Sequence, residues 1–172
     1  MISEKWQSAL AITPNAPPHL GSIATLEIAA ALNILLADVY SLYVKTTNLQ
    51  WHMSGRHFRD CHLLLEDHAD QIFAMTDEIS ERVRKLGRRP LQSVDHISRL
   101  QRQAEYDAAC TTPDNMFAEL CENNQQLMDS LEEIQVLCAW NRDAATARLL
   151  EAWLDQVRRR IRSLSIAARH AR

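Results

Sequence analysis

The chain contains 172 residues, of which 47% are hydrophobic and 24% are charged, and its net charge is −3 at pH 7. Three glycines and five prolines are few for this length, which favours a helix-rich globular domain. The longest strongly apolar run covers residues 28–37, whereas a bilayer span needs roughly 20 apolar residues. The first residues also lack a basic segment followed by an apolar core, so we expect a cytoplasmic protein with no membrane association.

The charge is unevenly distributed along the chain. Six arginines and no acidic residue follow Asp155, so this last segment carries +6 and residues 1–155 carry −9. The body is therefore acidic and only the end of the chain is basic. The cysteines are widely spaced and form no Cys-x-x-Cys pair, so we interpret them as buried free thiols; they are Cys61, Cys110, Cys121 and Cys138.

The first half of the sequence predicts an arm and two long helices. Residues 1–21 contain three prolines and are expected to be irregular. Residues 22–51 carry apolar side chains on more than one side of a helical pattern, which predicts a helix buried on several faces. A break at residues 53–57 precedes a second helix over residues 58–86, which Gly87 is expected to end.

The second half predicts a crossover and two more long helices. Residues 94–103 favour a short helix within the crossover. Thr112-Pro113-Asp114 places a capping hydroxyl, a proline and an acid at the start of the third long helix. A short turn at residues 141–143 separates it from the last helix, with Asp143 as the expected N-cap.

These elements predict an all-α fold, a four-helix bundle with a short helix in the long crossover between the second and third long helices. Two short connections separated by one long crossover are typical of ferritin-like bundles. The bundle is expected to cover residues 22–167, after the arm of residues 1–21 and before a basic tail of residues 168–172.

Four side chains on the second predicted helix could bind a metal ion. His62 and Glu66 lie four residues apart, as do Asp77 and Glu81, so the members of each pair share a helix face. The two pairs fall within roughly 60° of each other around the helix axis. Histidine together with carboxylates suits iron.

The distance between the pairs decides how such a site could be assembled. Glu66 and Asp77 are 11 residues apart, which corresponds to roughly 16 Å along a helix. Because iron–ligand bonds are near ~2 Å, the two pairs of one chain cannot bind the same ion. Two antiparallel copies of the helix across a two-fold axis would bring one pair from each chain together and create two identical sites.

Other residues on or near this helix have simpler interpretations. An exposed helix carries acids and histidines at these spacings by chance, so the spacing alone does not establish a metal site. Asp67, His68 and Glu78 fall on other faces and are interpreted as solvated, whereas local hydrogen bonding is expected for His52 and His57. No Glu-x-x-His motif occurs, which disfavours a di-iron centre within a single bundle.

The region around these residues resembles the Dps family of mini-ferritins. Residues 45–58 (KTTNLQWHMSGRHF) and the closing Leu86-Gly87 match the family pattern at fixed spacing. The similarity continues through the last helices and covers about residues 22–165. The matching metal positions between the two motifs are His62, Glu66, Asp77 and Glu81.

The resemblance implies a homo-oligomer, a hollow dodecamer with ferroxidase centres at its two-fold interfaces. It implies that ferrous iron is oxidised there, typically by hydrogen peroxide, and that the ferric product is stored inside the shell, which protects against oxidative stress. His62, Glu66, Asp77 and Glu81 correspond to the family's metal ligands, and Glu66 stands where aspartate is also common.

Gln50 and Trp51 precede these ligands in the sequence. Trp51 matches the family's tryptophan near the centre, where it could absorb radical equivalents; the alternative is a packed core aromatic. Gln50 stands where the family usually has a histidine. An amide oxygen is a weaker ligand for ferrous iron than imidazole, so we expect weaker binding or one metal per site, and slower oxidation.

The resemblance also implies DNA binding, which in this family often depends on a lysine-rich tail. The arm contains only Lys5, whereas arginines are concentrated at the other end of the chain. Arg169 and Arg172 from many copies could bind phosphates together, although a solvated basic helix end is the simpler interpretation. Two functions stay open: a peroxide-consuming ferroxidase, or a DNA-binding structural cage with a degenerate metal site.

Overall fold

The computed structural model describes residues 21–52, 58–103 and 113–170, and it consists there of helices and their connections. The four long helices are α1 (Ser22–His52), α2 (Phe58–Lys85), α4 (Pro113–Asn141) and α5 (Ala144–His170), and the short helix is α3 (Val94–Leu100). The predicted all-α bundle with a short helix in the crossover is therefore confirmed. The predicted N-terminal arm lies outside the described residues, apart from Gly21.

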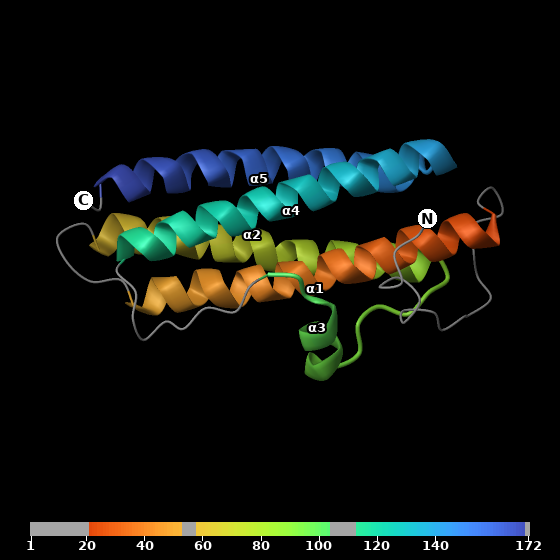
Figure 1. Ribbon diagram of the computed structural model, residues 1–172, viewed down its shortest axis with the longest axis horizontal. Helices are drawn as coiled ribbons and strands as arrows, with labels where there is room; N and C mark the ends of the chain where they lie inside the picture. The colour runs from red at the N-terminus through yellow and green to blue at the C-terminus, as the bar shows by residue number, and fades with distance from the viewer. Residues whose placement is uncertain (1–20, 53–57, 104–112, 171–172) are drawn as a thin grey trace.

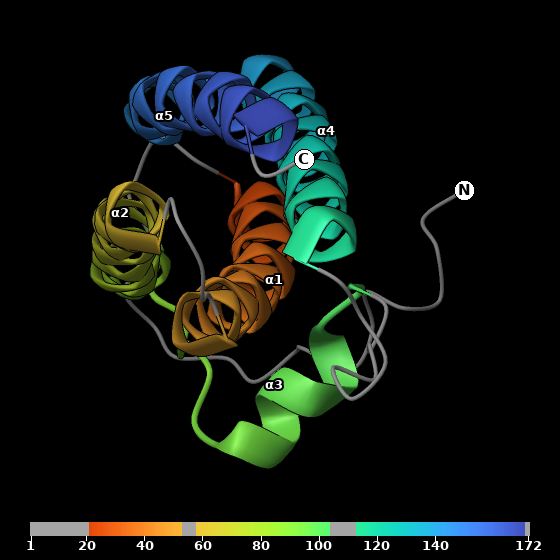
Figure 2. The ribbon, with the colours of Figure 1, turned by 90° about the vertical axis from the view of Figure 1, so that its left-hand side faces the viewer.

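The helices form two antiparallel pairs, as Figure 1 shows. α1 packs against α2 and α4 packs against α5, and the contact of α1 with α4 joins the two pairs. The crossover returns the chain along the bundle, so α2 and α4 run in the same direction (Figure 1). In the end view of Figure 2, the four long helices surround the core and α3 lies outside them, beside α1.

Helix α1 packs against α2, α3 and α4, and nearly all of its middle is apolar. Residues 28–37 are buried without interruption, with Ala, Leu and Ile on every side of the helix. The stretch Ile23–His52 is long and apolar enough to cross a membrane by composition, but 72% of the 18-residue apolar window within it is buried inside this protein. Burial against α2 and α4 accounts for that composition, as the predicted burial on several faces requires.

The helix ends follow the predicted capping signals. The amide of Thr146 donates to Asp143 Oδ1 at 3.1 Å, so Asp143 is the N-cap of α5. Gly87 has a positive φ of 75°, and its amide donates to the Arg84 carbonyl at 2.9 Å. Glycine adopts this left-handed conformation without a steric penalty, which explains why α2 ends there.

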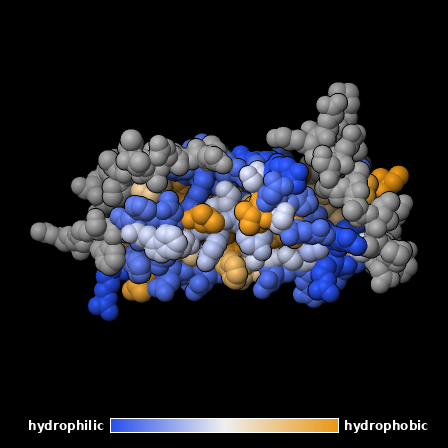
Figure 3. Space-filling view, turned by 90° about the horizontal axis from the view of Figure 1, so that it is seen from below, coloured by the Kyte–Doolittle hydropathy of each residue, from blue (hydrophilic) through white to orange (hydrophobic). Residues whose placement is uncertain are grey.

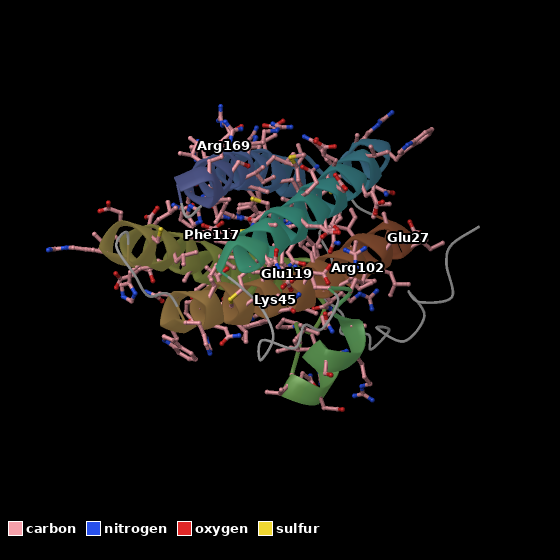
Figure 4. The ribbon with its side chains drawn as sticks, turned by 60° about the vertical axis from the view of Figure 1, so that its left-hand side comes forward. Glu27, Lys45, Arg102, Phe117, Glu119 and Arg169 are labelled. Atoms are coloured by element: carbon pink, nitrogen blue, oxygen red, sulfur yellow. The ribbon has the colours of Figure 1, made fainter. Side chains whose placement is uncertain are left out.

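Hydrogen bonds between polar side chains connect the crossover to the bundle. Arg102, just after α3, donates through Nη2 to Asp38 Oδ2 at 2.6 Å and to Ser130 Oγ at 2.7 Å. Asp38 lies on α1 and Ser130 on α4, so one guanidinium joins three parts of the chain. Nearer the start of α4, Lys45 Nζ donates to Glu119 Oε1 at 3.1 Å, and Figure 4 shows the two side chains between α1 and α4.

The end of the chain differs from the expected boundary. Helix α5 continues to His170, so residues 168–170 are helical and the expected boundary at residue 167 falls inside the helix. The helix starts immediately after its Asp143 cap and buries Trp153 completely on the way. A fully buried tryptophan and a fully buried Phe117 on α4 contribute strongly to the packing between these two helices and the rest of the core.

Candidate metal centre and surrounding surface

The end of α1 and the start of α2 bring Gln50 and His62 together. The amide nitrogen of Gln50 lies 3.3 Å from His62 Nε2, and both side chains are half-buried. The two residues are 12 positions apart in sequence and meet because the chain reverses direction between α1 and α2. The structure thus places Gln50 directly against one of the candidate ligands.

The carboxylates of the candidate site lie on the outer surface of α2. Glu66, Asp77 and Glu81 are all exposed. Glu81 forms an ion pair with Lys85 one turn later, at 2.7 Å. The hydrogen bond and the positive charge of Lys85 lower the pKa of Glu81, which favours its ionised form.

These acids belong to a longer exposed stripe that also contains apolar side chains. The stripe has steps of three or four residues along α2, and its members are Leu63, Glu66, Asp70, Phe73, Asp77 and Glu81. Leu63 is 54% exposed and Phe73 is 49% exposed, although the Phe73 ring also contacts the Tyr43 ring in a tilted arrangement, with centroids 5.2 Å apart. Apolar residues repeated along an exposed helix face are typical of a surface that another molecule covers.

Within one chain, the candidate ligands remain separated. Over the described residues, no group of three or more His, Cys, Asp or Glu side chains is arranged to hold one metal ion. His62 and Glu81 are 19 residues apart on the same helix, which is roughly 28 Å along its axis. Any site that uses both ligand pairs therefore needs a second copy of α2.

Trp51 is 75% exposed at the end of α1, so within this chain it is not a packed core aromatic. The sequence left both interpretations open, because tryptophan can pack in a core or lie at an interface. Its neighbour His52 hydrogen bonds to the carbonyl of Asn48 at 2.8 Å, which confirms the expected local contact. His57, the other histidine expected to bond locally, lies outside the described residues.

The prediction that His68 is solvated was wrong. His68 is 4% exposed, and its Nε2 lies 3.0 Å from Ser163 Oγ on α5. Burial, reinforced by the charge of Arg160, lowers its pKa to about 4, so the ring is neutral at pH 7. Glu78 and Asp67 are exposed as expected, and Glu78 also accepts a hydrogen bond from Trp153 Nε1 at 2.7 Å.

Arg160 follows two other arginines in the sequence, so composition alone did not indicate that it belongs to the core. It stands among exposed arginines in the basic segment, yet its side chain is 1% exposed and donates through Nε to Asn124 Oδ1 at 3.0 Å. The helical period explains the difference, because Arg160 follows the buried Val157 by three residues and precedes the buried Leu164 by four. Only its position on the inner face of α5 distinguishes it from its neighbours.

The other arginines that follow Asp155 in α5 are exposed and make this part of the helix surface basic. Arg158, Arg159, Arg162 and Arg169 are exposed, whereas Arg172 lies outside the described residues. Arg158 is paired with Glu132 at 3.4 Å and Asp155 at 3.8 Å, which partly neutralises it. Figure 4 shows Arg169 near the C-terminal end of α5, and Figure 1 shows that α1 ends and α2 begins at the same end of the bundle.

The cysteines behave as the sequence indicated wherever they can be described. Cys61 and Cys138 are buried free thiols and Cys121 is a partly buried one, while Cys110 lies outside the described residues. Burial raises the pKa of Cys138 to about 12, so its thiol is protonated at pH 7. Cys138 therefore has the properties of a core residue.

The face of the molecule that carries α3 is largely hydrophilic. Figure 3 shows this face, with separate hydrophobic spots on a mostly polar surface. Val94 at the start of α3 is 81% exposed. Isolated apolar side chains of this kind are ordinary on protein surfaces.

The family of the chain follows from comparison with known proteins. The family model described as the ferritin-like domain matches residues 29–170, so the chain belongs to the ferritin-like family. Its fold and relatives place it beside the Dps proteins within that family, which confirms the resemblance found in the sequence.

Two relatives illustrate this relationship. An uncharacterized low temperature-induced protein from Nostoc is 35% identical over 102 residues, which are 59% of this chain and 57% of that protein's length. A DNA protection during starvation protein from Halobacterium salinarum is 41% identical over 75 residues, 44% of this chain and 38% of the relative. The crystal structure of an archaeal Dps homologue from Halobacterium salinarum superposes with a TM-score of 0.85 at 24% identity, covering 93% and 90% of the two chains.

A third similarity concerns the fold alone. A Dps protein from Vibrio cholerae superposes with a TM-score of 0.82 at 20% identity, covering 91% of this chain and 98% of that one. It is described as a member of a broad superfamily of ferritin-like diiron-carboxylate proteins.

Proposed function

We propose that this protein is a Dps-like iron-binding cage subunit that oxidises ferrous iron at sites shared between two copies. The observation that carries the proposal is the exposed stripe on α2, whose acids Glu66 and Asp77 are separated by roughly 16 Å, with the half-buried His62 one turn before Glu66. In an antiparallel dimer, His62 and Glu66 of one copy would face Asp77 and Glu81 of the other. The same contact would cover Leu63 and Phe73, whose exposure otherwise costs hydrophobic free energy.

The donor set fits ferrous iron as substrate. One imidazole and three carboxylates provide the mixed nitrogen and oxygen ligands that iron accepts, and the carboxylates balance its charge. The lowered pKa of Glu81 keeps one of them ionised in mild acid. Ferritin-like and diiron-carboxylate relatives support iron rather than another metal as the substrate.

The proposed reaction uses hydrogen peroxide. Two ferrous ions each lose one electron, and peroxide takes both electrons and two protons to form two waters. The ferric product would be stored in the cavity of a dodecamer in the cytoplasm. The reaction would thereby remove both ferrous iron and hydrogen peroxide, which together generate damaging radicals. Trp51 stands next to Gln50 and is exposed, so it could donate an electron to a stray radical before other groups are damaged.

Gln50 is expected to make this centre slower than one with histidine at that position. An anaerobic ferrous titration followed by peroxide would compare the natural protein with Gln50→His. We expect the substitution to increase the number of ferrous ions bound per site and the oxidation rate. Unchanged affinity and rate would show that position 50 does not limit the reaction.

Mixed assembly tests whether the site is shared. His62→Ala and Asp77→Asn would each be prepared alone and then co-assembled in equal amounts. Each variant alone should lose iron binding, but in a mixed dimer one of the two sites would contain no substitution. Random mixing should restore about one quarter of the sites, whereas a site built within one chain would not be restored at all.

DNA binding is the alternative function, and the exposed arginines of α5 favour it. Arg159, Arg162 and Arg169 are exposed in the C-terminal half of α5 and would be repeated in every subunit. Gel retardation of duplex DNA at increasing salt tests this role, with Arg159→Ser and Arg162→Ser combined as the variant and Arg99→Ser on α3 as the control. We expect retardation that weakens with salt and with the double variant; no retardation at low salt would exclude DNA as a partner.

A further inference from the structure

The hydrogen bond between Gln50 and His62 has a defined donor and a defined acceptor. The structure places the amide nitrogen of Gln50, rather than its oxygen, 3.3 Å from His62 Nε2. An amide nitrogen donates hydrogen bonds and does not accept them, so His62 Nε2 is the acceptor. The tautomer of His62 that accepts this hydrogen bond carries its proton on Nδ1 and its lone pair on Nε2.

That lone pair is the one a metal ion would need. A neutral imidazole has a single nitrogen lone pair, and a nitrogen that accepts a hydrogen bond through it cannot ligate a metal at the same time. The amide nitrogen has no lone pair to offer the metal in exchange. Gln50 in this orientation competes with a metal ion for His62 and does not bind the ion beside it.

We propose that Gln50 is a positioning residue that covers His62 Nε2 and is displaced when a metal ion binds there. It holds the imidazole in the tautomer that ligation through Nε2 requires, but metal binding must break its hydrogen bond. This inference rests on the proposed metal site and makes Gln50 a regulator of that site instead of a ligand. The natural protein should therefore bind one ion per site, and less tightly than its ligands allow.

Cobalt(II) binding to the assembled protein tests this inference without using the oxidation reaction. Visible absorption and calorimetry would be recorded for the natural protein, Gln50→Leu, His62→Ala and Gln125→Leu. Leucine keeps much of the glutamine volume but cannot donate a hydrogen bond. Gln125, an exposed residue of α4 whose amide contacts Asp129 at 3.0 Å, provides a matched control away from α2.

We expect Gln50→Leu to bind cobalt(II) roughly two- to tenfold more tightly at the His62-dependent site, which corresponds to one hydrogen bond removed. The number of ions per site should stay the same, and Gln125→Leu should match the natural protein. His62→Ala defines the background, because cobalt bound to cysteines or to other residues remains in that variant. Gln50→Glu introduces an ionised carboxylate that accepts hydrogen bonds but cannot donate them. This variant should bind a second ion per site, and it replaces the leucine variant in the test if the latter does not assemble.

The outcomes separate this inference from the proposed function. If His62→Ala binds cobalt(II) like the natural protein, no metal site includes His62 and both proposals fail. If binding depends on His62 but Gln50→Leu and Gln50→Glu bind no more tightly than the natural protein, the metal site stands and the competing role of Gln50 is wrong.

Discussion

Arg82 donates through Nη2 to both carboxylate oxygens of Asp143, at 2.7 Å and 2.8 Å. The pair joins the last turn of α2 to the cap of α5, and both side chains are buried. Thr146 completes the group, since its hydroxyl accepts from Arg82 Nε at 2.7 Å and donates to Asp143. One buried aspartate thus caps a helix and neutralises a buried cation.

Replacing Asp143 with alanine should strongly destabilise the fold. The substitution leaves the Arg82 guanidinium buried without its counterion and removes the α5 cap, so we expect a loss of roughly 3–5 kcal/mol. Denaturant unfolding followed by circular dichroism measures this loss. Asp95→Ala, which breaks an exposed ion pair with Arg99, is the control and should change stability little.

The same pair should respond to acid. Burial alone would raise the pKa of Asp143, but the hydrogen bonds from Arg82 and Thr146 outweigh it and hold the pKa below the ordinary value of 3.8. A carboxylate with a lowered pKa stabilises the fold above its unfolded pKa, and this contribution is lost as the pH falls through the folded pKa. The natural protein should lose stability below about pH 4 more steeply than Asp143→Asn does.

His68 should produce a separate pH dependence at milder acidity. Its folded pKa of about 4 lies below the unfolded value of 6.5, so the unfolded chain binds the proton first as the pH falls. Stability should therefore decrease by about 3 kcal/mol between pH 6.5 and 4. His68→Gln keeps a partner for Ser163 and should flatten the profile in this window, whereas His52→Gln, an exposed histidine, should not. An unchanged profile for His68→Gln would show that another group titrates there.

The buried guanidinium of Arg160 should be replaceable by an apolar side chain of similar length. Arg160 contacts Asn124 and the Met75 sulfur and forms no ion pair among the described residues, so it has little to offset its desolvation. We expect Arg160→Met to cost under about 1 kcal/mol or to stabilise the fold, and Arg160→Ala to cost roughly 2–5 kcal/mol because of the cavity. Thermal unfolding of the two variants checks the order; similar losses in both would contradict it.

Trp51 should report metal binding through its fluorescence if the proposed centre is correct. Cobalt(II) quenches a nearby indole, so the quenching should be largely lost in Trp51→Phe. Trp140 is 83% exposed near the C-terminal end of α4, at the opposite end of the bundle, so Trp140→Phe is a matched control that should retain it. Equal quenching in both variants would place the metal away from Trp51.

Much of the fold was predictable from local sequence signals. The end of α1 at His52, the glycine after α2, the start of α4 at Pro113 and the Asp143 cap of α5 all depend on residues close by in the sequence. Such signals depend on backbone geometry and capping groups, which do not require the rest of the chain. The two ligand pairs on α2 and their separation also followed from sequence, because both depend only on the helix rise and period.

Long-range packing decided what the local pattern could not. His68 was expected to be solvated, but it is buried because α5 covers that side of α2 and offers Ser163 as its partner. Arg160 looked like part of a basic surface and instead lies in the core, where its charge lowers the pKa of His68. The contact of Gln50 with His62 likewise depends on how α1 and α2 pair.

The sequence determined the helices, their ends and the residues available for metal chemistry, since these depend on neighbours in the chain. Tertiary structure alone decided which charged side chains are buried away from solvent and which side chain hydrogen bonds to His62. Burial and contact depend on residues far away in sequence.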